Sequence, residues 1–281
     1  MKVLITGANG QLGREIAKQY KLQENVQLQL TDHKDLDITD LSKVYEFFDQ
    51  YRPDVVINCA AYTQVDKCET DVDNAYKVNT IGPKNLAQAS NKIGAEIVQV
   101  STDYIFSGEE KTPITEFCDP DPQTVYGKTK LDGEVLVKDL NPKHYIFRTA
   151  WLYGDGNNFV KTMINLSKTH DKLKVVNDQV GSPTSTVDLA KIIIDSVAVK
   201  NYGTFHCTCK GQCSWYDFTK KIFEINNIKT QVIACSSDEF PRPAKRPHYS
   251  VLRNYMLELT TGDTTRNWEE AIKDYLENYD N

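Results

Sequence analysis

The feature that most constrains the fold is a glycine-rich segment near the start of the chain, residues 7–13 with the sequence GANGQLG. It lies between an apolar run at 2–6, typical of a buried strand, and an amphipathic run at 11–20, which predicts a helix. Glycines in such a turn permit close packing of helix on strand and the close approach of a pyrophosphate group, which the helix N-terminus would then face. The segment therefore predicts a dinucleotide site. Its spacing is G-x2-G-x2-G instead of G-x-G-x2-G, and a glycine-rich turn without a ligand is the alternative.

Strand and helix patterns alternate through the first half of the chain. Further apolar strands are predicted at 26–31, 54–58, 96–100 and 145–149, and helices at 40–51, at 72–92 with an interruption at Gly82-Pro83, and from about Tyr126. Short connections between these segments indicate a parallel sheet, and apolar strands without in/out alternation indicate burial on both faces. We therefore expect an α/β fold in which residues 1–150 form a doubly wound, Rossmann-type dinucleotide-binding domain.

The pattern changes beyond Ala150. Loops lengthen, and only short strands separate the helices predicted near 158–169, 187–199, 215–226 and 268–279. Such a segment is typical of a smaller α/β cap over the carboxyl edge of the sheet, where these folds bind ligands. We expect residues 151–281 to form mainly this substrate-binding cap, with some segments returning to the Rossmann domain.

Composition excludes several classes of protein. The 33 Lys and Arg residues against 39 Asp and Glu give a net charge of −6, which argues against nucleic acid as a partner. No apolar run approaches the roughly 18 residues of a membrane span, and the start of the chain does not read as a secretory signal, so we expect a cytoplasmic protein. The seven cysteines are expected to be reduced thiols. Those between His206 and Cys213 match no common zinc spacing and are interpreted as a strand end followed by a loop.

Cofactor preference depends on the end of the second predicted strand. Asp32 lies where an acidic side chain would accept a hydrogen bond from the adenosine ribose, which favours NADH because a 2′-phosphate would meet its negative charge. His33 and Lys34 follow directly and could accommodate that phosphate, so NADH and NADPH both stay open. A solvated turn is the alternative for these residues.

Tyr126 and Lys130 form a Y-x3-K pair that would share one face of a helix. Lowering the pKa of a tyrosine by roughly three units takes about 4 kcal/mol, which a neighbouring ammonium and a nicotinamide ring could supply in a water-poor cleft. Alone, such a pair is more often an exposed surface feature. The run STDYIF at 101–106, directly after the fourth strand, adds hydroxyl groups that could hold a substrate carbonyl oxygen.

Taken together, these motifs resemble the extended short-chain dehydrogenase/reductases and, within them, the dTDP-4-dehydrorhamnose reductases. The resemblance covers nearly the whole chain. It includes residues 7–13, 58–66, 78–79, 101–106, 126–130, 148–154, 158–163, 178–184 and 214–216, and Arg246-Pro247 with Ser250 and Leu252. The motifs of the second half are the more specific ones.

The resemblance implies a role for individual residues. Tyr126 would be the proton donor, Lys130 its partner and a ribose contact, and Thr102 the catalytic hydroxyl. Substrate contacts would be Thr102, Asp103 and Trp151, although a core aromatic is the alternative for Trp151. The glycine turn and the family's cofactor contacts together predict a cofactor site of Gly7, Gly10, Gln11, Leu12, Gly13, Asp32, Asp37, Ile38, Ala60, Ala61, Tyr62, Tyr126 and Lys130.

The implied reaction is the NAD(P)H-dependent reduction of the C4 ketone of dTDP-4-dehydro-6-deoxy-L-mannose to dTDP-L-rhamnose. A sugar-nucleotide epimerase or dehydratase of the same superfamily, or a non-catalytic NAD(P)-binding regulatory subunit, would share many of these motifs. Some relatives bridge a homodimer with a divalent metal. Here Glu15 matches the first acidic position, Asp188 replaces a glutamate and Asn278 occupies the last, so the grounds for a metal are weak and the existence of a homodimer stays open.

Overall fold

A six-stranded parallel sheet forms the centre of the molecule, in the order β10-β5-β4-β3-β1-β2. The computed structural model describes residues 1–278. The strands are β1 (Lys2–Thr6), β2 (Gln27–Thr31), β3 (Val55–Asn58), β4 (Glu96–Thr102), β5 (His144–Thr149) and β10 (Gly203–His206). The chain changes direction across the sheet between β1 and β3. In open α/β sheets, ligands bind outside the carboxyl ends of the strands at such a point.

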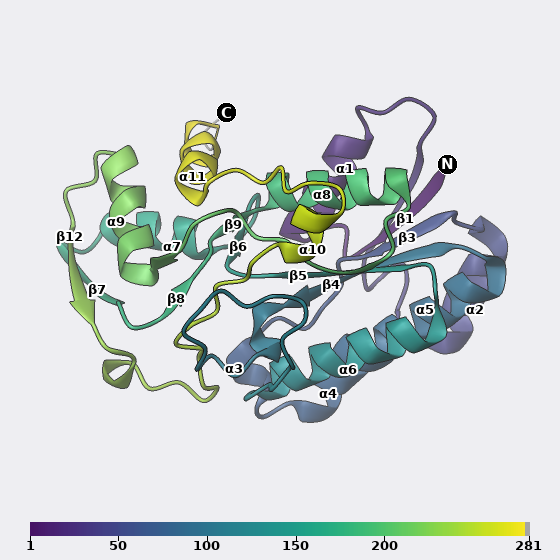
Figure 1. Ribbon diagram of the computed structural model, residues 1–281, viewed down its shortest axis with the longest axis horizontal. Helices are drawn as coiled ribbons and strands as arrows, with labels where there is room; N and C mark the ends of the chain where they lie inside the picture. Colours follow the sequence, from purple (N-terminus) through teal and green to yellow (C-terminus); the bar gives the residue numbers. More distant parts are fainter. Residues whose placement is uncertain (279–281) are drawn as a thin grey trace.

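Helices cover both faces of the sheet (Figure 1). One face is covered by α1 (Gln11–Tyr20), α8 (Thr186–Val199) and α10 (Tyr255–Leu259), the other by α2 (Leu41–Tyr51), α5 (Gly82–Ile93) and α6 (Val125–Leu140). Alternate residues of β1 enter the two cores: Ile5 packs with the first group of helices and Leu4 with the second. The predicted doubly wound α/β fold is confirmed.

Local sequence explains where the main helices begin. Asp40 caps α2 by accepting from the N–H groups of Ser42 and Lys43, and Thr124 caps α6 by accepting from that of Gly127. The interruption expected at Gly82-Pro83 is wrong, because α4 (Val72–Tyr76), a π-helical turn η1 (Lys77–Ile81) and α5 follow one another without a break. Pro83 lies in the first turn of α5, inside this continuous helical run, so its missing N–H removes one intrahelical hydrogen bond next to η1.

The cap has its own small core, in which Tyr153, Phe218 and Trp268 are buried together. Its helices are α7 (Phe159–Ser167), α9 (Trp215–Ile225) and α11 (Trp268–Glu277). Its strand pairs are β7 (Lys172–Val176) with β12 (Gln231–Cys235), β8 (Val180–Gly181) with β11 (Cys213–Ser214), and β6 (Leu152–Tyr153) with β9 (Thr184–Ser185). Figure 1 shows this group beside one end of the sheet.

Three elements after residue 150 lie with the sheet instead: α8 packs near α1, α10 covers the same face, and β10 extends the sheet beyond β5. A domain boundary at residue 150 stays a prediction. Tyr279, the expected end of the last helix, and the two residues after it lie outside the described residues. Within residues 1–278, no helix has both the length and the apolar character that a membrane span needs.

Candidate active site

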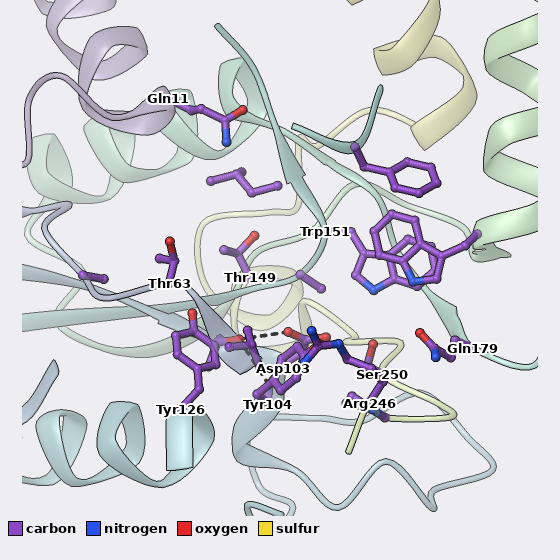
Figure 2. A pocket seen from close by; sticks show the side chains of 18 of the residues that line it. Gln11, Thr63, Asp103, Tyr104, Tyr126, Thr149, Trp151, Gln179, Arg246 and Ser250 are labelled. Atoms are coloured by element: carbon purple, nitrogen blue, oxygen red, sulfur yellow. Dashed lines mark hydrogen bonds between the residues drawn. The ribbon is translucent and has the colours of Figure 1, made fainter. Parts of the chain in front are cut away.

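A cavity of about 1040 Å³ opens where the carboxyl edge of the sheet meets the cap. The glycine turn and the cap's aromatic side chains both line it, and so do the Tyr126–Lys130 pair and the residues that follow β4. Figure 2 shows Gln11, Tyr126 and Trp151 among the lining side chains. Of the predicted site residues, the cavity is lined by Gly10, Gln11, Leu12, Gly13, Ala60, Ala61, Thr102, Asp103, Tyr126, Lys130 and Trp151. Gly7, Asp32, Asp37, Ile38 and Tyr62 are not among its lining residues.

The glycine turn fits a dinucleotide. Gly7 has a φ of +64°, and a Cβ there would lie 2.6 Å from the backbone nitrogen of Ala60, so a side chain is excluded. A Cβ on Gly13 would lie 2.7 Å from the Cα of Ala8. Gly10 occupies the N-cap of α1 and has no side chain to cap the helix. The first N–H groups of α1 can therefore bind an anionic group.

The Tyr126–Lys130 pair lies at the start of α6. Tyr126 is 9% exposed, and its ring meets that of Tyr104 edge to face at a centroid distance of 5.5 Å. Burial raises the pKa of Tyr126, while the nearby Thr102 hydroxyl acts to lower it. Lys130 is also buried, and its Nζ donates to the carbonyl oxygen of Val100 at 2.5 Å. Burial lowers the pKa of Lys130 to about 8, against the opposing effects of Glu134 and Cys59.

Thr102 and Asp103 bring polar oxygens to the same cavity. The Thr102 hydroxyl donates to Asp103 Oδ1 at 3.0 Å and accepts from the N–H of Tyr104 at 3.2 Å. Burial raises the pKa of Asp103 to about 6, although hydrogen bonds with Ser250 and Thr102 act to lower it. Among the described residues, the buried atoms without a hydrogen-bond partner include Asp103 Oδ2, Ser101 Oγ and Thr149 Oγ1. All three residues line the cavity, so a polar ligand could satisfy them.

The five predicted cofactor residues outside the cavity have other contacts, Gly7 lying against Ala60 as described. Asp32 Oδ1 accepts from the N–H of His33 at 2.8 Å. Asp37 accepts from the N–H and hydroxyl of Thr39, and these bonds hold its pKa below the usual value although burial acts to raise it. Ile38 is buried beside α5, and the Tyr62 hydroxyl donates to Asp71 Oδ2 at 3.1 Å. A role for these residues in binding the cofactor stays a prediction.

The cap contributes an aromatic end to the cavity. Trp151 has a φ of +47°, and its indole lies flat on that of Trp215, with centroids 3.5 Å apart and an interplanar angle of 7°. Gly181 lies against the same indole, where a Cβ would approach Trp151 Cε2 to 2.6 Å. Phe159 packs on Trp215 at 4.3 Å between ring centroids. Trp151 therefore lines the cavity instead of filling the cap's interior.

Several lining residues have no role in the sequence-based prediction. Trp215, Arg246 and Ser250 belong to motifs that match the family, but the sequence analysis assigned them no role. Arg246 pairs with Asp66 at 2.9 Å, and its Nη1 is buried without a partner among the described residues. Other lining residues of this group are Phe159, Lys174, Gln179, Phe240 and Arg242. Phe159 and Gln179 also stood in matched motifs, at 158–163 and 178–184. No pattern in the sequence marked Lys174, Phe240 or Arg242.

The positions that resemble a family metal site have protein partners. Asp188 is buried, and its carboxylate accepts from Arg266 Nη2 at 2.7 Å, while Arg266 Nη1 donates to Asp274 at 2.9 Å. Glu15 accepts from Gln19 at 2.8 Å, and Asn278 donates to the carbonyl of Asp274. Residues 1–278 contain no group of three or more His, Cys, Asp or Glu side chains arranged to hold a metal.

A doubly wound sheet with a glycine turn and a Tyr–Lys pair in one cavity defines the class of nicotinamide-dependent enzymes of the Rossmann type. A family described as RmlD substrate binding domain matches residues 1–281. The chain is 42% identical to the spore coat polysaccharide biosynthesis protein SpsK of Bacillus subtilis, over 98% of this chain and 97% of that protein. It is 40% identical to the dTDP-4-dehydrorhamnose reductase of Aggregatibacter actinomycetemcomitans, over 97% of both chains.

Solved structures agree with these matches. A dTDP-4-dehydrorhamnose reductase from Clostridium acetobutylicum has a TM-score of 0.99 and 66% identity over 100% of both chains. The enzyme of that name from Bacillus anthracis, solved in complex with NADP, has a TM-score of 0.96 and 43% identity over 98% of both chains. The chain therefore belongs to the RmlD family. It is an oxidoreductase of the dTDP-4-dehydrorhamnose reductase type, and the resemblance found in its motifs is confirmed.

Proposed function

We propose that the protein reduces the C4 ketone of dTDP-4-dehydro-6-deoxy-L-mannose to dTDP-L-rhamnose, with NADPH or NADH as reductant and Tyr126 as proton donor. The observation that carries this proposal is the position of Tyr126, Lys130 and Thr102 in one cavity, which the glycine turn and the Trp151–Trp215 stack also line. Membership of the RmlD family supports the reaction class.

The reduced nicotinamide, when bound, supplies the hydride that adds to C4 of the sugar. Tyr126 supplies the proton: its O–H bond breaks as the sugar oxygen gains the hydrogen. Burial keeps this phenol protonated at neutral pH, as a general acid requires. The Lys130 ammonium stabilises the phenolate that remains. The Thr102 hydroxyl, whose one proton goes to Asp103 Oδ1 in this structure, gives up that bond and donates to the same sugar oxygen.

Two observations, one on a relative and one on the end of β2, bear on the choice of cofactor. The relative from Bacillus anthracis was solved with NADP, which supports NADPH. Asp32 would oppose a 2′-phosphate, while His33 and Lys34 beside it would attract one. His33 is exposed, and its Nδ1 lies 3.8 Å from Asp37 Oδ1. We therefore propose that the protein uses either cofactor, and that the residues at the end of β2 determine its relative affinity for NADPH and NADH.

A second candidate substrate is a different dTDP-linked 4-keto sugar. The chain is 39% identical, over 98% of its length, to a Streptomyces antibioticus protein named as a probable dTDP-4,6-dihydroxy-2-methyloxan-3-one 4-ketoreductase. The carbonyl position is the same and the sugar differs. For an epimerase or dehydratase the support is weaker: a UDP-glucose 4-epimerase of Thermus thermophilus and a dTDP-glucose 4,6-dehydratase of Streptomyces venezuelae are 19% and 16% identical to this chain and show the fold alone.

The test is a screen of dTDP-linked and UDP-linked 4-keto-6-deoxy sugars, each with NADPH and with NADH, followed by loss of reduced-nicotinamide absorbance. We expect continuous oxidation with dTDP-4-dehydro-6-deoxy-L-mannose and little with the UDP sugars. Reactions lacking the sugar give the background rate. Preference for another dTDP-linked sugar would favour the second candidate, and no oxidation with any sugar would overturn both.

A further inference from the structure

A buried ion pair lies beside the catalytic lysine without lining the cavity. Arg148, in β5, donates from Nε to both carboxylate oxygens of Glu134 at 3.2 and 3.1 Å, and from Nη2 to Oε2 at 2.8 Å. Glu134 is 2% exposed and Arg148 7%. Removing two charges from water costs several kcal/mol per ion, so such a pair is weak evidence for a stabilising role. The residue that this ion pair faces, Lys130, offers another reason for its presence.

Glu134 faces Lys130. The two residues are four apart on α6, so their side chains share one face of the helix. Lys130 is 3% exposed, and the one hydrogen bond of its side chain among the described residues goes to the neutral carbonyl of Val100. A buried ammonium with a neutral acceptor is prone to lose its proton, and a nearby carboxylate opposes that loss.

Few other charges bear on Lys130. Tyr126 lies one turn earlier on α6, and Cys59 follows β3; burial raises the pKa of each of these groups, so both are uncharged at neutral pH. β4 presents the Val100 carbonyl to Lys130. Arg148, from β5, is the other nearby cation, and it is bound to Glu134. Among the described groups, Glu134 is thus the one that supplies negative charge.

Arg148 determines how Glu134 acts. Because Arg148 binds both carboxylate oxygens, Glu134 is held in place and influences Lys130 through its charge instead of through a direct hydrogen bond. The Lys130 ammonium then keeps its hydrogen bond to the Val100 carbonyl, and Lys130 continues to line the cavity. We propose that Glu134, held by Arg148, is a positioning residue that keeps Lys130 charged for its work on Tyr126 and the cofactor. This inference rests on the role given to Lys130 in the proposed function.

The test measures NADPH affinity of the full-length protein against pH, by quenching of tryptophan fluorescence. In the native protein we expect affinity to fall as pH rises through about 8, where Lys130 loses its proton. Lys130→Met should abolish that pH step, which attributes it to Lys130. Glu134→Gln should move the midpoint down by about one unit or more, the usual scale for losing a close opposite charge. Arg148→Met should move it up, because Glu134 then acts without its opposing cation.

Two further variants keep the test decisive. Asp139→Asn changes an exposed carboxylate on the same helix and should leave the midpoint unchanged. If Glu134→Gln fails to fold because Arg148 is left unpaired, Glu134→Gln combined with Arg148→Met removes both charges and should also titrate below the native protein. Circular dichroism gives the folded fraction of each variant.

The opposite directions of the two shifts separate this proposal from a merely structural role. Loss of affinity with an unchanged midpoint in both single variants, or a shift of both in the same direction, would overturn it. So would a pH step that survives in Lys130→Met. If no 4-keto sugar is reduced but the NADPH titrations behave as described, the proposed function fails while the role of Glu134 stands.

Discussion

At the scale of single residues, burial sets the protonation of the groups that line the site. It raises the pKa of Tyr126, raises that of Asp103 to about 6 and lowers that of Lys130 to about 8. Each shift favours the neutral form, as desolvation does for any ionisable group. A protonated Tyr126 suits the proposed reduction, in which this tyrosine would give up its proton. The phenolate that would remain is unfavourable in this buried site, and the positive charge of Lys130 would stabilise it.

Replacement of Tyr126 tests the proton-transfer step. Tyr126→Phe removes one oxygen and little volume, so kcat should fall by about 10²–10⁴-fold while NADPH affinity changes little. Thr102→Val should lower kcat less, because the proton source remains. Steady-state rates with a saturating sugar give both values. Tyr45→Phe, on α2 and outside the cavity, is the matched control, and native turnover in Tyr126→Phe would refute the mechanism.

Asp32 tests the choice of cofactor at the end of β2. Asp32→Ala should weaken NADH binding by about 1–3 kcal/mol, the scale of a lost hydrogen bond to a charged group. NADPH binding should weaken less or improve, because a 2′-phosphate no longer meets the carboxylate. Fluorescence titration with each cofactor measures both changes. Equal losses for the two cofactors would show that Asp32 does not face the ribose.

At the scale of elements, helix α6 carries Tyr126, Lys130 and Glu134 and brings them to the sheet edge. The elements of the sheet could be predicted, because their apolar periodicity is a local property: β1, α1 and β3 lie within a residue of the expected ranges. The strands of the cap could not. β6, β8, β9 and β11 have two residues each and exist through pairing with distant segments. The π-helical turn before Pro83 leaves no local signal either.

Gly127 tests the fit of α6 against the segment after β4. A Cβ on Gly127 would collide with the carbonyl oxygen of Tyr104 and approach Pro122 Cβ to 3.2 Å. Gly127→Ala should therefore push α6 outward, lowering Tm and displacing the adjacent Tyr126, so kcat should fall as well. Calorimetry and steady-state kinetics measure the two effects. Lys128→Ala, exposed on the same helix, should be nearly neutral, and a gain in stability for Gly127→Ala would contradict the predicted collision.

At the scale of the whole molecule, the site joins segments that are far apart in sequence. Arg246 forms an ion pair with Asp66, and the Ser250 side chain forms a hydrogen bond with Asp103. The motifs themselves could be identified in sequence, but which of them meet depends on tertiary packing. Asp32, Asp37, Ile38 and Tyr62 do not line the cavity, and their role in binding the cofactor stays a prediction.

Gln11 tests the link between the glycine turn and the segment after β6. Its Oε1 accepts from the N–H of Gly154 at 2.9 Å and from Asn158 Nδ2 at 3.3 Å. Gln11→Ala should cost about 1–2 kcal/mol of stability and weaken cofactor binding, because the turn loses its support. Chemical denaturation and NADPH titration measure these losses. Gln23→Ala, at an exposed position, should have neither effect, and an unchanged Gln11→Ala protein would show that the link is dispensable.

The most direct test of the central claim follows the hydrogen that is transferred. The protein is given dTDP-4-dehydro-6-deoxy-L-mannose and NADPH carrying deuterium at both C4 positions of the nicotinamide, and the sugar product is examined by NMR. We expect one deuterium at C4 of the sugar for each NADPH oxidised, and far slower formation of this product by Tyr126→Phe. A product without deuterium at C4, or conversion of the sugar without net oxidation of NADPH, would contradict it.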